Sequence, residues 1–257
     1  MTAPRARSPI GPFLFPAFVV IAVLAGVMAQ VTTGSPRTVG IWVFLLVIAG
    51  WVITLCLHEF AHSVVALAGG DTSVRARGYL TLNPLKYTDP VFSIVIPLVL
   101  LAVGGIPLPG GAVLIEHYRL RSRAWQSLVS AAGPATNLIC GFVLTLLAGA
   151  VAGDGVTGLS AGLAFLAVLQ FVTFVLNILP VPGFDGFGIL APYLPAAVHR
   201  AVAPIRPWAP LIVFALIWSI PQASSILFDP ALWFYDLVGG SRTQAYWGQV
   251  LFQFWKL

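Results

Sequence analysis

The sequence predicts an all-α polytopic membrane protein with about six transmembrane helices, a small membrane-associated β-hairpin and one re-entrant segment. Hydrophobic residues make up 59% of the 257 residues and charged residues only 8%, and the mean hydropathy is +0.96. This composition lies far outside the range of soluble globular domains. Arg and Lys occur in short clusters between long apolar runs, so the net charge of +5 reflects membrane topology and does not indicate a nucleic-acid partner.

The first predicted transmembrane helix covers residues 13–29, which is long enough to cross a bilayer. Val27-Met28-Ala29 also resembles a signal-peptide cleavage site, so a cleaved leader is the alternative. We expect a retained helix, because more apolar segments follow and because Arg5 and Arg7 fit a cytoplasmic amino terminus.

The second predicted helix, residues 39–68, carries the motif His58-Glu59-Phe60-Ala61-His62 and stops at Gly69-Gly70, a typical helix end. Residues four apart on a helix lie roughly 40° apart around its axis, so both imidazoles can bind one metal ion. In an H-E-x-x-H motif the two His bind zinc and the Glu serves as general base. The alternative is a pair of buried histidines that hydrogen-bond a neighbouring helix, although ionisable groups at membrane depth are usually functional.

A more polar segment, residues 71–88, follows this helix. Residues 74–82 alternate in character and are interrupted at Gly78, which predicts one or two short β-strands. Because a strand edge can hydrogen-bond an extended peptide, this region is a candidate substrate clamp. The candidate substrate-binding residues in it are Val74, Leu80, Leu82 and Asn83.

The apolar residues 91–103 are too few for a clear span and include Pro97, so we expect them to re-enter the membrane. Basic residues lie on both sides of them, which places both flanks in the cytoplasm by the positive-inside tendency. These residues are Arg75, Arg77 and Lys86 before the segment and Arg119, Arg121 and Arg123 after it.

Two further helices are predicted at residues 127–151 and 161–179, running outward and then back inward. The first contains small residues that permit close helix contact, together with Asn137, whose side chain could bond across that contact. A last span is predicted at 208–220. The tail after it holds a further span, an interfacial helix around 227–238, or both.

A catalytic zinc site usually has three protein ligands and an open position, so a third ligand is needed. The helices at 39–68 and 161–179 both run inward, so their carboxyl-terminal ends lie at similar depth. Asp185 follows the second of these helices in a segment broken by prolines and glycines, and it can therefore reach the histidines. Alternatively, Asp185 is a turn residue in a Gly-Phe-Asp-Gly bend. His117 is the next candidate ligand, and the other candidates are Asp71, Asp89, Glu116, Asp154, His199, Asp229 and Asp236.

Asn177 lies eight residues before Asp185, near the end of the predicted inward helix. Its side chain could cap that helix. It could also donate a hydrogen bond to a substrate carbonyl or to the oxyanion formed from it.

Three separated motifs resemble the site-2 protease (M50-like) family of intramembrane zinc metalloproteases. They are His58 to His62, the stretch Thr-Leu-Asn-Pro-Leu-Lys-Tyr-Thr-Asp-Pro at 81–90, and Asn-Ile-Leu-Pro-Val-Pro-Gly-Phe-Asp-Gly at 177–186, which is similar to the family pattern N-x-x-P-x-x-P-x-D-G. Gly133-Pro134 through Asn137 also resembles the third core helix of the family. The motifs occur in the family's order within residues 39–190, and this combination is more specific than any single motif.

The resemblance implies a role for each matching residue. His58, His62 and Asp185 would bind one Zn²⁺ per chain, and Glu59 would be the catalytic base. Asn177 and the strands near 74–82 would hold an unwound substrate. Gly183 and Phe184 depart from the common family pattern, but neither belongs to the implied ligand set.

We therefore expect a single integral membrane protease domain over residues 1–257, of a minimal form without PDZ or CBS domain. The catalytic core would cover about 39–190, with C-terminal helices and the tail at 191–257. The expected function is hydrolysis of peptide bonds within or near transmembrane segments of membrane-protein substrates, as in regulated intramembrane proteolysis. The expected location is a bacterial-type plasma membrane, with the amino terminus and active site toward the cytoplasm. The alternative is a non-catalytic metal-binding scaffold or a transporter that uses the two histidines in its path.

Overall fold

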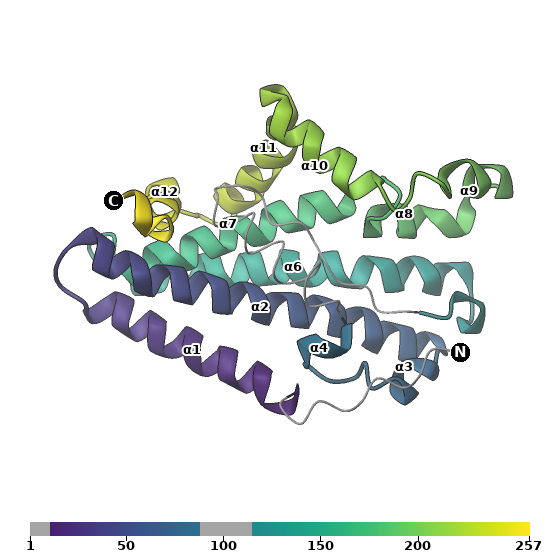
Figure 1. Ribbon diagram of the computed structural model, residues 1–257, viewed down its shortest axis with the longest axis horizontal. Coiled ribbons are helices and arrows are strands. Elements are labelled where there is room, and N and C mark those ends of the chain that lie inside the picture. The colour runs from purple at the N-terminus through teal and green to yellow at the C-terminus, as the bar shows by residue number, and fades with distance from the viewer. Residues whose placement is uncertain (1–10, 88–114) are drawn as a thin grey trace.

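Four long apolar helices form the body of the protein. The computed structural model describes residues 11–87 and 115–257, apart from the side chains of residues 218, 221 and 223. The long helices are α1 (Gly11–Val31), α2 (Pro36–Gly69), α6 (Arg123–Val151) and α7 (Gly158–Ile178), and they run side by side along the longest axis (Figure 1). Among the described residues, these four helices are long and apolar enough to cross a bilayer. The protein is an integral membrane protein.

The direction of these helices places the expected site residues at one end of the bundle. α2 and α7 run parallel to each other, and α1 and α6 run the opposite way (Figure 1). The carboxyl ends of α2 and α7 therefore point toward the same end of the bundle, where α8 (Asp185–Leu190) packs against α6 and α7 and is followed by α9 (Ala196–Val202). We call this end of the bundle the α8 end. α12 (Arg242–Phe252) lies at the opposite end (Figure 1).

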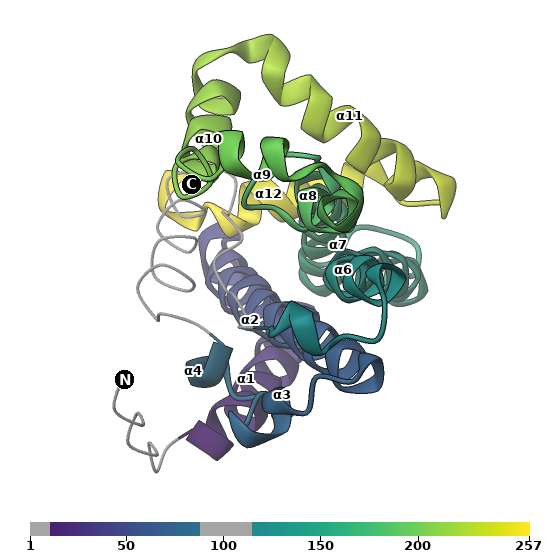
Figure 2. The same cartoon turned by 90° about the vertical axis from the view of Figure 1, so that its right-hand side faces the viewer.

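The remaining described elements are short or lie on the outside of the bundle (Figure 2). They are α3 (Ser73–Ala76), α4 (Pro84–Tyr87), η2 (His117–Arg119), η3 (Ala191–Tyr193), α10 (Ala209–Ser219), α11 (Pro221–Leu237) and η4 (Phe254–Lys256).

Capping residues explain where the site-bearing helices begin and end. The Ser35 side chain accepts a hydrogen bond from the Thr38 N–H at the start of α2, and Pro36 follows it in the first turn. α2 ends where Gly70 adopts a left-handed conformation with φ of +114° and donates to the last carbonyls of the helix. α7 begins with a reciprocal capping box between Thr157 and Ser160.

Small residues let α2, α6 and α7 approach closely. A Cβ atom added to Gly50 of α2 would lie 2.4 Å from the Leu166 side chain of α7. A Cβ atom added to Gly141 of α6 would lie 2.8 Å from the Phe171 ring of α7. Lipid tails are as apolar as the helix surfaces, so close packing of this kind stabilises a membrane bundle more than burial does.

The structure corrects the predicted β-hairpin at 74–82. Residues 11–87 and 115–257 contain no strand, and residues 74–76 belong to α3. The Asp71 carboxylate accepts a hydrogen bond from the Ser73 N–H, which starts a helical turn. Local bonds from the Arg77 and Tyr79 N–H groups then close that turn. Val74 is completely buried in a cluster with Ala66, Leu120 and Val129, so it does not lie on an exposed edge.

The predicted span at 208–220 corresponds to α10, which has 11 residues. A helix of that size is about 16 Å long, and the hydrocarbon core of a bilayer is about 30 Å thick. The described residues therefore support four spans by length and composition, and the expected count of about six is not established. The expected re-entrant segment at 91–103 lies outside the described residues. The tail contains α11, which includes most of the expected interfacial helix at 227–238.

Candidate metal centre

His58, His62 and Asp185 lie together at the α8 end of the bundle. The two Nε2 atoms are 3.1 Å apart. Asp185 Oδ2 lies 3.3 Å from His58 Nε2 and 3.5 Å from His62 Nε2. Among the residues of segments 11–87 and 115–257, this is the one group of His, Cys, Asp and Glu side chains that could hold a metal ion.

The geometry of these three atoms fits a zinc ion. Tetrahedral zinc with nitrogen and oxygen ligands at about 2.0–2.1 Å has ligand atoms about 3.3 Å apart, close to the three separations found here. Two imidazoles and one carboxylate are also a donor set that catalytic zinc sites use. One coordination position would remain open for water or substrate.

Gly133 of α6 leaves the space that an ion in this position needs. A Cβ atom at residue 133 would lie 2.3 Å from His62 Nε2 and 2.4 Å from His58 Nε2. Any side chain at this position would therefore occupy the space beside the two ligand nitrogens. The fit of the site to a metal thus depends on α6 as well as on the residues that supply ligand atoms.

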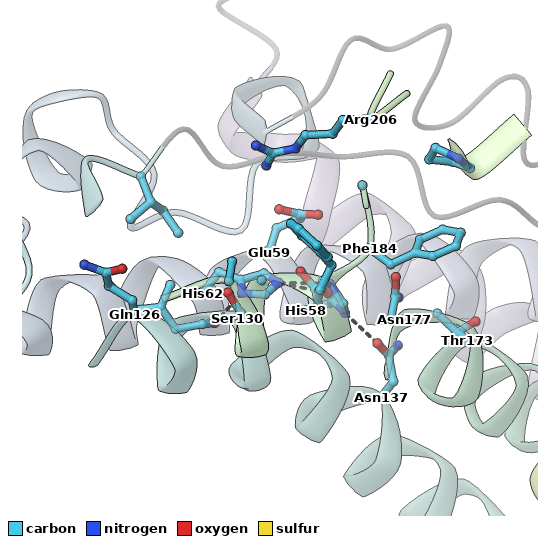
Figure 3. Close-up of a pocket in the computed structure, with 18 of the residues that line it drawn as sticks. His58, Glu59, His62, Gln126, Ser130, Asn137, Thr173, Asn177, Phe184 and Arg206 are labelled. Carbon is cyan, nitrogen blue, oxygen red and sulfur yellow. Dashed lines mark hydrogen bonds and ion pairs between the residues drawn. The ribbon is translucent and has the colours of Figure 1, made fainter. Parts of the chain in front are cut away.

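α6 also orients both imidazoles (Figure 3). His58 Nδ1 lies 2.5 Å from Asn137 Oδ1, and His62 Nδ1 lies 2.6 Å from the carbonyl oxygen of Val129. When each Nδ1 donates its proton to such an acceptor, the Nε2 lone pair is free for a metal. Asn137 therefore makes the interhelix hydrogen bond that the sequence suggested.

The break between α7 and α8 carries Asp185 to the histidines. α7 ends at Ile178, and Gly183 turns the chain with φ of +103°. α8 then lies directly against the end of α7, since a Cβ atom on Gly186 would be 2.1 Å from the carbonyl oxygen of Ile178. Ser127 of α6 donates a hydrogen bond of 2.6 Å to the carbonyl oxygen of Ile189, which holds α8 in this place.

A cavity of about 540 Å³ surrounds the three ligand atoms. Glu59 lines this cavity beside His58 and is only 3% exposed (Figure 3). The cavity is large enough for several water molecules and a segment of peptide. A carboxylate beside a metal centre in such a cavity can act as a proton acceptor for water.

Asn177 lines the same cavity and is 3% exposed. Its Nδ2 has no hydrogen-bond partner among the described residues. Buried amide groups are normally satisfied, so this donor is an exception in the wall of the cavity.

The other sequence candidates lie in different places. His117 and His199 line the cavity but do not belong to the three-residue group. Burial and the neighbouring Arg206 guanidinium both lower the pKa of His117, so its imidazole stays neutral near pH 7. Val74, Leu80, Leu82 and Asn83 are not part of the cavity lining. The Asn83 side chain instead accepts a hydrogen bond from the Leu85 N–H at the start of α4.

Sequence reasoning missed three contributors to the site. The carbonyl of Val129 could not be found, because any residue has a carbonyl group. Arg206 lines the cavity, but in the sequence it is one more basic residue between apolar segments, which indicates only topology. Gln170, which hydrogen-bonds Asn137, could have been noticed as the one amide side chain within the apolar run 161–176.

Two histidines, one aspartate and an adjacent glutamate, gathered in a bundle of membrane-crossing helices, define an intramembrane metal centre of the kind that hydrolases use. Several relatives are named as zinc metalloproteases. Rip2 of Mycolicibacterium smegmatis is 43% identical over 240 residues, which are 92% of each chain. Rip2 of Mycobacterium tuberculosis H37Rv is 43% identical over 216 residues, covering 84% of this chain and 82% of the relative. YwhC of Bacillus subtilis is 33% identical over 184 residues, covering 69% and 81%.

No family model and no solved structure matches the chain. The relatives alone settle the assignment, because they are similar over most of their length. The chain belongs to the site-2 protease family of zinc metalloproteases.

Proposed function

We propose that this protein is an intramembrane zinc metalloprotease that hydrolyses peptide bonds within or near transmembrane segments of other membrane proteins. The observation that carries the proposal is the gathering of His58, His62 and Asp185 beside Glu59 in one cavity at the end of a membrane bundle. A site that only bound metal would not need the adjacent carboxylate. The zinc metalloprotease names of the relatives support the same conclusion.

In this proposal His58, His62 and Asp185 hold the zinc ion. Zinc, when bound, would supply a Lewis acid that acidifies water and polarises a peptide carbonyl. Glu59 accepts a proton from the water whose oxygen bonds to the carbonyl carbon, and it gives that proton to the amine nitrogen as the C–N bond breaks. Asn177 donates a hydrogen bond from Nδ2 to the substrate carbonyl oxygen, where negative charge develops.

The substrate is a segment of a membrane protein that must first lose its helical hydrogen bonds. A helical backbone shields its carbonyl groups, and unwound backbone is tolerated in a membrane only beside protein or water. The cavity supplies polar groups for that purpose at its wall, including Asn177 and Ser130.

We place the catalytic core at about residues 39–190 of a single protease domain spanning 1–257.

We propose that the α8 end faces the cytoplasm. Most Lys and Arg of the described residues lie in loops and short helices at that end, and cytoplasmic loops carry an excess of these residues. They are Arg75, Arg77, Lys86, Arg119, Arg121, Arg123, Arg200 and Arg206. Arg37 belongs to the first turn of α2, Arg242 to α12 and Lys256 to η4, and these elements lie at the opposite end (Figure 1).

The substitution Glu59→Gln tests the proposal. It removes the proton acceptor and leaves the three ligand side chains intact, so cleavage of a transmembrane substrate in detergent should fall by about 10² to 10⁴-fold. The zinc-to-protein ratio should not change. Asp154→Asn, in the exposed loop between α6 and α7, is the matched control and should cleave like the wild type.

Cleavage by the Glu59→Gln variant at the wild-type rate would refute the proposal. A wild-type protein that binds zinc but cleaves no membrane substrate would favour a metal-binding scaffold or a transporter instead.

A further inference from the structure

A chain of buried polar side chains leads from His58 across the bundle to a backbone carbonyl. Its members come from three helices: Thr54 and His58 from α2, Asn137 from α6 and Gln170 from α7. Thr54 is 7% exposed, Asn137 is 3% exposed and Gln170 is completely buried. Polar groups at such a depth are costly unless they are hydrogen-bonded, so this chain needs an explanation.

Every link of the chain has the geometry of a hydrogen bond. Asn137 Nδ2 donates to Gln170 Oε1 at 2.8 Å. Gln170 Nε2 donates to Thr54 Oγ1 at 2.9 Å. Thr54 Oγ1 donates to the carbonyl oxygen of Trp51 at 2.9 Å. Asn137 Oδ1 is left facing His58 Nδ1.

The direction of donation is set at the Trp51 end of the chain. A carbonyl oxygen can only accept, so the Thr54 hydroxyl proton points to Trp51 and the hydroxyl oxygen must accept from Gln170. The Gln170 amide then presents its oxygen to Asn137, and the Asn137 amide presents its oxygen to His58. His58 Nδ1 must consequently carry the proton, and Nε2 keeps the lone pair that faces His62 and Asp185.

His62 reaches the same state by a shorter route. Its Nδ1 faces the carbonyl oxygen of Val129 directly, and that oxygen also can only accept. A backbone carbonyl therefore sets the tautomer of each imidazole. It acts on His62 through one hydrogen bond, and on His58 through the side chains of Thr54, Gln170 and Asn137.

We propose that Thr54 and Gln170 are positioning residues that select the Nδ1–H tautomer of His58 and so keep its Nε2 free for the metal. The proposal rests on the metal site of the proposed function. Without the Thr54 hydroxyl, the Gln170 amide can rotate by half a turn and so can the Asn137 amide behind it. Asn137 would then present its NH₂ group to His58 and stabilise the opposite tautomer.

The first test reads the tautomers in the metal-free full-length protein. The four imidazoles of the chain are labelled with ¹⁵N, assigned by single His→Gln variants, and observed in detergent at a pH where their spectra are those of neutral rings. We expect wild-type His58 as the Nδ1–H tautomer, and a mixture of tautomers in Thr54→Val, which has nearly the same shape. Thr54→Ser keeps the hydroxyl and should restore the wild-type signal.

A matched control distinguishes an effect of this hydrogen-bonded chain from an effect of any buried Thr→Val substitution. Thr145 of α6 is also buried, but its hydroxyl donates to Gly141 of its own helix and has no connection to His58. Thr145→Val should leave the His58 tautomer unchanged. His62 should keep its tautomer in every variant, since it depends on Val129 alone.

The second test measures the zinc dissociation constant of the same proteins. Thr54→Val should raise it at least about twofold, the factor expected if half of the molecules hold the wrong tautomer. Gln170→Leu breaks the chain at its centre and should raise it about tenfold, as is typical for residues that orient a metal ligand. Gln170→Leu has to be compared with Thr54→Ser, which keeps every hydrogen bond of the chain.

Two results would overturn the proposal: the Nε2–H tautomer of His58 in the wild type, or an unchanged His58 tautomer in Thr54→Val. The tautomer signal needs neither zinc nor cleavage. The proposed function can therefore fail while the predicted tautomers are observed. The tautomer prediction can equally fail in a protein that cleaves its substrate, so the two failures are distinguishable.

Discussion

Gly133 shows how a single residue without a side chain shapes the site. Its Cα lies so close to the two imidazoles that a Cβ atom would fall 2.3 Å and 2.4 Å from their Nε2 atoms. Real Cβ atoms do not approach other heavy atoms that closely, so even a methyl group would have to displace the histidines. The ligands of the site come from α2 and α8, but the space for the ion comes from α6.

We predict that Gly133→Ala abolishes stoichiometric zinc binding while the helices still assemble. The control is Gly149→Ala on the same helix, where an added Cβ meets nothing within 4 Å. Gly149→Ala should keep its zinc and gain up to about 1 kcal/mol from helix propensity. Metal analysis of both purified variants checks this prediction, and full zinc content in Gly133→Ala would contradict it.

Asp71 is a second residue with a large local effect. Its carboxylate accepts hydrogen bonds of 2.9 Å from the N–H groups of Ser73 and Glu116, which ties the end of α2 to the segment before α6. Burial alone would raise the pKa of Asp71, but the bonds from Ser73 and Glu116 outweigh it and hold that pKa below its usual value. The ionised form is therefore the one that stabilises the fold.

We predict that Asp71→Asn lowers the free energy of unfolding by about 1–3 kcal/mol at neutral pH, because the amide can accept only one of the two bonds with its oxygen. The contribution of Asp71 is fully present above the pKa of an unfolded Asp, about 3.9, and is lost as pH falls through the lower folded value. Thermal unfolding in detergent across this range should show the two proteins converging in acid. A constant difference down to the lowest pH would contradict the prediction, and Asp154→Asn is the control.

The sequence could predict some of these residues and not others, for physical reasons. His58 and His62 share one helix face by spacing alone, and the two parallel helices imply that Asp185 can reach them. The contact between Gln170 and Thr54 joins residues 116 positions apart on neighbouring helices. It depends on the rotation of each helix about its axis, which no local pattern specifies.

The break between α7 and α8 is the element that completes the site. Pro180 and Pro182 end the helix, Gly183 reverses the chain, and α8 starts with Asp185. Prolines and glycines near a membrane surface predicted this break. The predicted strands at 74–82 failed because alternation of residue types also fits a short helix followed by a turn, and the Asp71 hydrogen bond starts that helix.

We predict that Gly186→Ala weakens zinc binding without unfolding the bundle. The new methyl group would lie 2.1 Å from the carbonyl oxygen of Ile178, and backbone cannot move aside as a side chain can. α8 must then shift and carry Asp185 away from the histidines, with a cost in packing of about 1–3 kcal/mol. Zinc titration and thermal unfolding of the same sample test this, and unchanged zinc affinity would show that α8 tolerates the shift.

At the scale of the whole molecule, α2 and α8 bring the three candidate ligands and Glu59 together at one end of a bundle of four membrane-crossing helices. Hydropathy and helix direction were sufficient to predict this arrangement. Hydropathy was not sufficient to predict the number of spans, because α10 is strongly apolar but too short to cross a bilayer alone.

We predict that the two ends of the bundle lie on opposite sides of the membrane, with the α8 end inside. In a background without Cys56 and Cys140, Gly155→Cys should react with a membrane-impermeant maleimide on intact cells, and Arg121→Cys should not. Both positions are exposed in the folded protein. Inverted vesicles should give the reverse pattern. Labelling of Arg121→Cys on intact cells would place the α8 end outside.

The central claim is that one zinc site is completed by Asp185, more than a hundred residues away from the two histidines. The most direct measurement is the zinc-to-protein ratio of the purified wild type, Asp185→Ala and His117→Ala. We predict one zinc per chain in the wild type and in His117→Ala, and loss of zinc in Asp185→Ala. A zinc-to-protein ratio of one in Asp185→Ala, together with loss of zinc in His117→Ala, would contradict the account. His117 would then be the third ligand.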